Sequence, residues 1–179
     1  MKTVGVLALQ GGFDAHAAAL LRAGLLPRLV RAPADAVGLD GLILPGGEST
    51  VHLKLIERHG LDAPLRALAA TGTPILGTCA GLILAARQVS SGQPSFGWLD
   101  VAVDRNAWGR QVDSFETVDD AGRRPLIFIR GPRVTQVGPD VEVLATYRGE
   151  PVLVRQGRVH GAAYHPELVG SELHAEIFS

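Results

Sequence analysis

The chain has 179 residues and a formal net charge of −1 at pH 7, with 17 Lys and Arg against 18 Asp and Glu. This length suits one domain with a sizeable core, so we expect a single domain over residues 1–179. The near-zero charge, with no basic cluster among aromatic residues, argues against nucleic-acid binding, and the apolar N-terminal stretch is too short to span a membrane.

The first half of the chain alternates short apolar runs with longer helical patterns. This alternation is typical of βαβ units around a parallel sheet, so we predict an α/β fold. We expect strands over 3–9, 26–30, 41–44 and 74–77, and helices over 16–23, 50–59, 63–70 and 80–89.

The pattern changes after residue 95. Apolar runs there are separated by turn residues, which predicts strands with short connections, and the polar segment 90–95 should be a loop. The expected later strands are 98–103, 126–129, 141–147, 151–156 and 159–164.

Cys79 is the single cysteine, and it lies in the run Gly77-Thr78-Cys79-Ala80-Gly81. Glycines two residues to either side let the backbone turn sharply from strand into helix and leave the apical side chain exposed. The start of a helix also favours a thiolate. We therefore predict that Cys79 is a nucleophile, and a buried core cysteine is the alternative. A lone cysteine forms no intramolecular disulfide, so a cytoplasmic location is expected.

Two further loops follow expected parallel strands, Gln10-Gly11-Gly12 and the segment 45–50. Ligands bind at the carboxyl edge of open α/β sheets, so we expect these loops to meet Cys79 in space. The backbone N–H groups of Gly47 and Ala80 are the candidate oxyanion donors. The alternative for segment 45–50 is an ordinary turn with Ser49 or Thr50 as helix N-cap.

A thiolate nucleophile needs a base that also protonates the leaving group, and imidazole has a suitable pKa. His165 ends an apolar run and is followed by Pro166-Glu167. Residues i and i+2 of an extended segment face the same side, so Glu167 is the candidate orienter of His165. The other five histidines show no comparable setting, and we expect them to be solvated or capping residues. They lie at positions 16, 52, 59, 160 and 174.

No pair of histidines has the spacing of a metal motif and there is no second cysteine, so zinc is not indicated and we expect neither metal nor cofactor.

Five segments occur in an order that resembles the family of glutaminase subunits of pyridoxal 5′-phosphate synthase, within the class I glutamine amidotransferases. The similarity covers nearly the whole chain. The segments that hold Cys79 and His165 are common to the wider class, whereas the Gly-Gly-Glu-Ser-Thr segment and the arginine segment are much more specific to the subfamily. The segments are LPGGEST at 44–50, GTCAGL at 77–82, RN at 105–106 with GRQVDSF at 109–115, FIR at 128–130, and HPEL at 165–168.

The resemblance implies a three-layer, flavodoxin-like core with a mostly parallel sheet and added antiparallel strands. It implies hydrolysis of L-glutamine to glutamate and ammonia, with a γ-glutamyl thioester on Cys79 and with proton transfer by His165 under the guidance of Glu167. Arginine suits the substrate carboxylate and a carboxylate suits its ammonium group. The implied glutamine-site residues are Gly47, Glu48, Ser49, Arg105, Ile129 and Arg130, whereas Arg110 and Asp113 are given only a structural role.

The resemblance also implies a partner, a (β/α)₈-barrel synthase subunit that receives the ammonia within a large hetero-oligomer. The glutaminase is then weak until docking orders the oxyanion loop. Gln10, Gly11 and Gly12 are the candidate docking residues, and a plain βα turn is their alternative.

Two other functions are alternatives. The chain could serve another synthase as its glutaminase, because the nucleophile, base and orienter would be shared and only docking would differ. It could also be a non-catalytic α/β binding module in which Cys79 is a redox sensor or a core residue.

Overall fold

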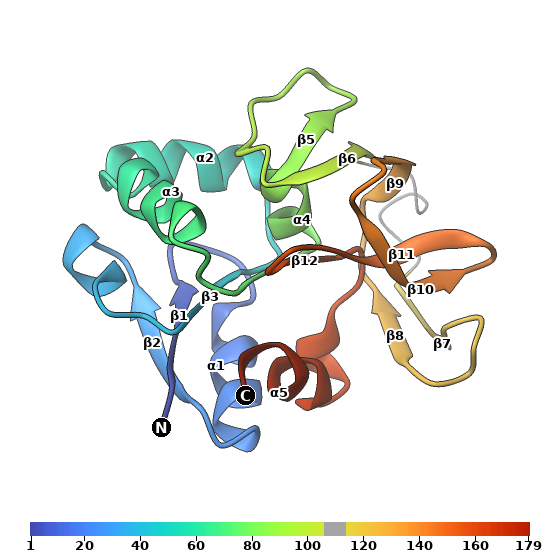
Figure 1. Ribbon diagram of the computed structural model, residues 1–179, viewed down its shortest axis with the longest axis horizontal. Helices are drawn as coiled ribbons and strands as arrows, with labels where there is room; N and C mark the ends of the chain where they lie inside the picture. The colour runs from blue at the N-terminus through green and yellow to red at the C-terminus, as the bar shows by residue number, and fades with distance from the viewer. Residues whose placement is uncertain (106–113) are drawn as a thin grey trace.

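A computed structural model describes residues 1–105 and 114–179. Its central sheet has seven strands in the order β10-β11-β12-β4-β3-β1-β2 (Figure 1). The five strands from β12 to β2 are parallel, and β10 and β11 extend the sheet in antiparallel fashion. Their bounds are β1 Thr3–Leu7, β2 Leu26–Val30, β3 Gly41–Leu44, β4 Ile75–Thr78, β10 Glu142–Tyr147, β11 Glu150–Gln156 and β12 Val159–Ala162.

Helices cover both faces of this sheet. In Figure 1, α2 and α3 lie on one side of it, and α1 and α5 lie on the other. Strand β3 shows why both faces need cover: Leu42 and Leu44 join one apolar cluster, while Ile43 between them joins the other. The helices are α1 Phe13–Arg22, α2 Ser49–Arg58, α3 Asp62–Ala70, α4 Ala80–Ala85 and α5 Glu172–Phe178, with short 3₁₀ helices η1 Pro33–Ala36 and η2 Pro166–Leu168.

Two small sheets stand beside the antiparallel end of the central sheet. Strands β5 (Ala86–Val89), β6 (Leu99–Asp104) and β9 (Arg133–Val137) form one of them, and β7 (Phe115–Val118) pairs with β8 (Pro125–Phe128) in the other. Arg105, directly after β6, and Ile129 and Arg130, directly after β8, line the cavity described below.

The structure confirms the α/β fold with a mostly parallel sheet and added antiparallel strands. All the expected strands are present, with ends shifted by up to two residues, and segment 90–95 is a loop. The sequence patterns missed β5, β7, β9, both 3₁₀ helices and α5.

The helix expected over 80–89 is wrong in its second half. Helix α4 ends at Ala85, and the next four residues form β5, which pairs with β6. All six residues of α4 are buried, so the helix has no solvent face. A continued helix would place Arg87 and Gln88 one turn after Ile83 and Leu84, on buried faces, whereas β5 leaves both polar side chains exposed.

None of the helices in the described ranges 1–105 and 114–179 is long and apolar enough to cross a membrane.

Gly81 decides how closely α4 approaches the sheet. A Cβ at this position would overlap the backbone carbonyl of Leu44 in β3, which cannot rotate away. We therefore expect Gly81→Ala to lower the free energy of unfolding by about 3 kcal/mol or more, at the upper end of overpacking costs. Urea denaturation measures the loss.

Gly72→Ala is the matched control for this prediction. Gly72 has φ +74° and no atom within 4 Å of an added Cβ, so the substitution costs only the strain of a left-handed residue. That strain is roughly 1–2 kcal/mol. Equal losses in the two variants would contradict the close packing of α4 on β3.

Candidate active site

Four parallel strands end at one edge of the sheet, and the loops that follow them surround one cavity of about 390 Å³. The loops after β1, β3, β4 and β12 bring together the segments that the sequence singled out, as expected for the carboxyl edge of an open sheet. The cavity is lined by Gln10, Gly11, Gly12, Gly46, Gly47, Glu48, Ser49, Cys79, Ile83, Arg105, Ile129, Arg130 and His165.

Cys79 occupies the sharp turn between β4 and α4. Its backbone has φ 51° and ψ −107°, an unusual conformation for a residue with a side chain, and its N–H donates to the Ala162 carbonyl of β12 at 2.9 Å. The predicted turn is therefore present. The expectation of an exposed side chain is wrong, because Cys79 is only 7% exposed and its sulfur lies in the wall of the cavity, 3.8 Å from the Ile129 carbonyl oxygen.

The structure brings together His165 and Glu167, the residues predicted as base and orienter. His165 Nδ1 lies 2.7 Å from Glu167 Oε1, and both residues are buried, at 9% and 4% exposure. The geometric reason differs from the one expected. Strand β12 ends at Ala162, and Glu167 reaches His165 from the 3₁₀ helix η2 and not along an extended segment. The N–H of His165 donates to the Ile127 carbonyl of β8 at 2.8 Å, which fixes the backbone.

The charges of the pair support each other. Burial opposes a charge on the His165 ring, but the Cys79 side chain and the Glu167 carboxylate favour it more strongly and raise the pKa of His165 to about 10. Burial also opposes the charge on Glu167, but the hydrogen bond with His165 and the nearby His16 leave the pKa of Glu167 below its usual value. An imidazolium and a carboxylate therefore coexist beside the thiol.

Gly46 lies where a side chain would separate the nucleophile from the base. A Cβ at Gly46 would be 2.7 Å from His165 Cε1 and 3.4 Å from Cys79 Cβ. The Gly46 carbonyl accepts a hydrogen bond from the Gly12 N–H at 3.1 Å. This contact ties the loop after β1 to the loop after β3 on the cavity wall.

Gln10 braces the same loop. Its side-chain amide donates to the Glu48 carbonyl at 3.1 Å and accepts from the Glu48 N–H at 3.4 Å. Gly47 has φ 148°, and an added Cβ there would lie 2.6 Å from Gln10 Oε1, so only glycine fits beside this amide. The loop after β1 is thus part of the cavity wall, with Gly11 exposed at its tip.

Charged groups stand at the mouth of the cavity. Arg130 Nη1 lies 3.8 Å from Glu48 Oε1, and both side chains are largely exposed, so a substrate could displace this weak ion pair. Arg130 has φ 50°, directly after Ile129, and Arg105 follows the end of β6. These groups can bind an ammonium and a carboxylate at the same time.

Ser49 and Ala80 are each the first residue of a helix, and both are buried. Ser49 lines the cavity but is buried, and its hydroxyl donates to Gln93 Oε1 at 3.1 Å. The alternative of Ser49 or Thr50 as N-cap is wrong, since α2 begins at Ser49 and Glu48 holds the cap position. Ala80 is buried at the start of α4, directly after Cys79.

Part of the sequence motif cannot be placed. Arg110 and Asp113, to which a structural role was given, lie outside the described residues. Ile83 lines the cavity one helical turn after Cys79 and was missed, although its i+4 spacing from the nucleophile was a usable signal.

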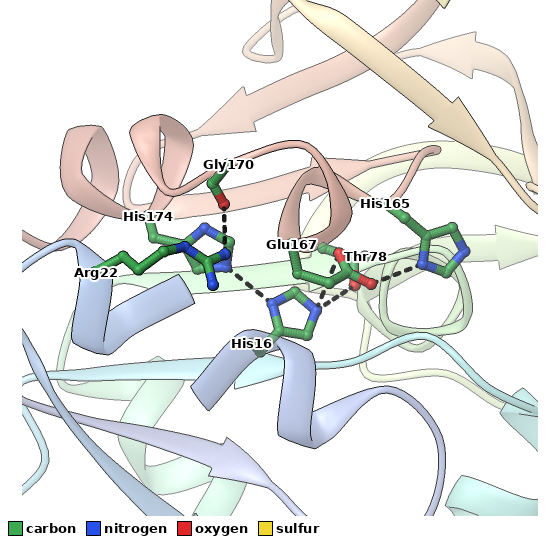
Figure 2. Close-up of polar contacts among 7 residues, drawn as sticks. All are labelled: His16, Arg22, Thr78, His165, Glu167, Gly170 and His174. Atoms are coloured by element: carbon green, nitrogen blue, oxygen red, sulfur yellow. Dashed lines mark hydrogen bonds and ion pairs between the residues drawn. The ribbon is translucent and has the colours of Figure 1, made fainter. Parts of the chain in front are cut away.

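The expectation that the other histidines are solvated or capping residues is wrong for three of them. His16, His52 and His174 are all fully buried. Burial lowers the pKa of His52 to about 4. His16 and His174 contact each other behind Glu167, as Figure 2 shows, and no local sequence pattern marked them. His59 at the end of α2 is exposed, as expected.

The His165–Glu167 pair predicts how stability depends on pH. The folded-state pKa of His165 is raised from 6.5 to about 10, so its contribution is complete below 6.5 and is lost as the pH rises through about 10. The Glu167 contribution is present above 4.5 and is lost on acidification, because its folded-state pKa is lowered.

We therefore expect the stability of the wild type, relative to His165→Asn, to fall as the pH rises from about 6.5 to about 10, by up to roughly 1.4 kcal/mol per pH unit. Urea unfolding of both proteins across this range measures the difference. A difference that stays constant with pH would contradict the charged pair.

Several curated proteins are similar to this chain over most of their length. A protein of Deinococcus radiodurans named pyridoxal 5′-phosphate synthase subunit PdxT is 51% identical over 176 residues, which cover 93% of this chain and 90% of the relative. A protein of the same name from Herpetosiphon aurantiacus is 46% identical over 186 residues, covering 98% of both chains.

Solved structures also match this chain. A structure titled as a glutamine amidotransferase matches with a TM-score of 0.90 and 44% identity, over 97% of this chain and 96% of the other. The PurLQS structure from Thermotoga maritima matches with a TM-score of 0.69, over 99% of this chain and 95% of the other, at 21% identity, which bears on the fold alone. The model of the SNO glutamine amidotransferase family matches residues 6–178. This chain therefore belongs to the SNO glutamine amidotransferase family.

Proposed function

We propose that this chain is one glutaminase domain over residues 1–179 that hydrolyses L-glutamine to L-glutamate and ammonia and passes the ammonia to a synthase subunit that makes pyridoxal 5′-phosphate. The observation that carries the proposal is the contact between His165 Nδ1 and Glu167 Oε1 at 2.7 Å, beside a cavity that Cys79 and His165 both line. Family membership and the names of the relatives give the reaction class.

The first half-reaction forms a thioester. Cys79 attacks the side-chain carbonyl carbon of glutamine as a thiolate paired with the protonated His165, and the His165 proton passes to the departing nitrogen, which leaves as ammonia. Glu167 stays ionised and stabilises the imidazolium. The N–H groups of Gly47 and Ala80 are the proposed donors to the oxyanion, and losing one such donor typically costs about 2.7–4 kcal/mol of transition-state stabilisation.

Hydrolysis completes the cycle. Water attacks the thioester carbon, His165 accepts one water proton, and the bond to the Cys79 sulfur breaks, which restores the thiolate beside the imidazolium. The new carboxyl group of glutamate gives its proton to solvent. No cofactor enters either step. The position of Cys79 in the cavity wall supports this role over the alternative of a core cysteine, since the residue lines the space that a substrate would fill.

The substrate end groups have partners at the mouth of the cavity. We propose that Glu48 binds the α-ammonium of glutamine, and that Arg105 and Arg130 bind its α-carboxylate. Gly47, Ser49 and Ile129 complete the wall. Binding would replace the Glu48–Arg130 ion pair, which is exposed and weak, with two charge pairs to one ligand.

The partner is proposed from the names of the relatives, which are subunits of pyridoxal 5′-phosphate synthase. The resemblance adds that this partner is a (β/α)₈ barrel in a large hetero-oligomer in the cytoplasm. Docking at residues 10–12 would act on the oxyanion loop, because Gln10 and Gly12 hold it by hydrogen bonds. Glutaminase activity would then depend on docking.

The decisive experiment is glutamate formation from L-glutamine by this chain, alone and mixed with a pyridoxal 5′-phosphate synthase subunit, with Cys79→Ala as control. Activity that rises on mixing and vanishes in the control is the expected result. Activity that does not change on mixing would favour a glutaminase that serves another synthase. No activity, either alone or with the synthase subunit, would favour a binding module.

We expect Cys79→Ser to abolish thioester formation while glutamine binding and partner docking stay within about twofold of the wild type, because oxygen replaces a far more nucleophilic sulfur of similar size. Mass spectrometry after mixing with glutamine detects the acyl-enzyme, and calorimetry measures binding. A serine variant that turns over glutamine would count against covalent catalysis by Cys79.

Glu167→Gln should reduce kcat less than His165→Asn, because an orienting residue is more dispensable than the base. We expect a gap of about tenfold or more in kcat/KM, measured in the presence of the synthase subunit. Equal and complete losses in both variants would show that the two residues do not have these separate roles.

A further inference from the structure

Glu167 uses only one of its two carboxylate oxygens on His165. Oε1 contacts His165, whereas Oε2 is buried, makes no hydrogen bond within the described part of the chain, and lies 3.4 Å from Nε2 of His16 in α1. Figure 2 shows Glu167 between the two imidazole rings, with dashed contacts to both. His16 is fully buried, so its ring nitrogens must find partners within the protein.

The remaining contacts of His16 come from two other elements. Its Nε2 also lies 3.0 Å from the Thr78 hydroxyl at the end of β4, and its Nδ1 lies 2.9 Å from Nε2 of His174 in α5. Thr78 and His174 are fully buried as well. Thr78 directly precedes Cys79, and Glu167 contacts His165. The contacts of His16 therefore link the turn at Cys79 and the His165–Glu167 pair to α5.

His16 is uncharged near neutral pH. Burial lowers the pKa of His16 to about 4, with the attraction of Glu167 only partly offsetting it. Burial and the neighbouring His16 lower the pKa of His174 to about 3, and the Arg22 guanidinium, which lies near this ring in Figure 2, adds to the effect. Each ring therefore carries a single N–H, and the hydrogen bonds decide which nitrogen holds it.

Two observations select the same arrangement. The nitrogen that faces the ionised Glu167 should carry a hydrogen, which places it on His16 Nε2 and makes Nδ1 an acceptor. Within the described part of the chain, Nδ1 of His174 is buried and has no hydrogen-bond partner. A hydrogen there would be an unpaired buried donor, so His174 holds it on Nε2 and donates to His16 Nδ1.

We propose that His16 is a positioning residue of the glutaminase: its Nε2–H, which is hydrogen-bonded to the Thr78 hydroxyl, attracts Glu167 Oε2 at 3.4 Å, keeps Oε1 on His165, and is itself oriented by His174. This inference rests on the proposed function. An uncharged donor suits this place, because a second cation would compete with His165 for the carboxylate. The N–H of His174 then points at His16, and the Nε2–H of His16 points at Glu167. His165 faces the same carboxylate from its other oxygen.

The kinetic test compares His16→Leu with His16→Gln in glutamate formation with the synthase subunit present. Leucine removes the donor, so kcat should fall about ten- to a hundredfold through misplacement of the base, with KM for glutamine within about twofold. Glutamine places an amide N–H near the position of Nε2 and should recover at least about a third of kcat. His59→Leu, an exposed histidine remote in role, is the control and should match the wild type.

Several outcomes would overturn the proposal. An unchanged kcat in His16→Leu, or a rise in KM with kcat unchanged, would contradict a positioning role. Failure of His16→Gln to recover activity while its thermal unfolding matches that of the wild type would contradict the role of the donor. A wild type that hydrolyses no glutamine, even with the synthase subunit, would refute the proposed function itself.

A second measurement does not depend on activity or on the folding of a variant. Nitrogen-15 spectra of the wild-type chain labelled at histidine report which ring nitrogens carry hydrogen. We expect His16 and His174 to be protonated on Nε2 alone at neutral pH, with assignments from single His→Leu variants. Protonation of His16 on Nδ1 would overturn the proposal, even in a fully active enzyme.

Discussion

The site depends on one constraint, the turn that carries the chain from β4 into α4 at Cys79. The backbone there is held at φ 51° and ψ −107°, which a residue with a side chain adopts only when its surroundings compel it. Two glycines make the turn possible. A Cβ at Gly77 would lie 2.6 Å from the Gly81 carbonyl carbon, and one at Gly81 would overlap Leu44. The strand and the helix therefore meet at a distance that only these residues allow.

The turn matters because of its neighbours in the sheet. β4 lies between β3 and β12, so the nucleophile stands between the glycine loop and the segment that carries His165. The parallel order brings together groups that are 86 positions apart in the chain, from Cys79 to His165. An ion pair is then buried beside the thiol. Such a pair is costly to desolvate, and its hydrogen bond together with uncharged neighbours such as His16 makes it tolerable.

The sequence predicts the structure correctly where neighbouring residues determine it. It fails where contacts between segments far apart in the chain determine the local structure. The β-rich half shows this: α4 stops at Ala85 because β6, more than ten residues later, offers β5 a partner. Glu167 was assigned to His165 for a reason that does not hold, since η2 and not an extended strand brings the two together. His16 and His174 looked ordinary, because nothing near either of them in sequence indicates that α1 and α5 would pack their rings together behind Glu167.

By itself, the sequence determined the α/β class and the parallel strands with their loops at one edge, and it singled out Cys79, His165 and Glu167 as the proposed nucleophile, base and orienter. These follow from apolar periodicity and from the glycines around Cys79, which are local properties of the chain. Only the tertiary structure decided that Cys79 is buried in a cavity wall, that Gln10 and Gly12 hold the glycine loop, and that His16 and His174 are buried behind Glu167. Burial and hydrogen bonding between distant segments set these features, and neither is encoded in the spacing of neighbouring residues.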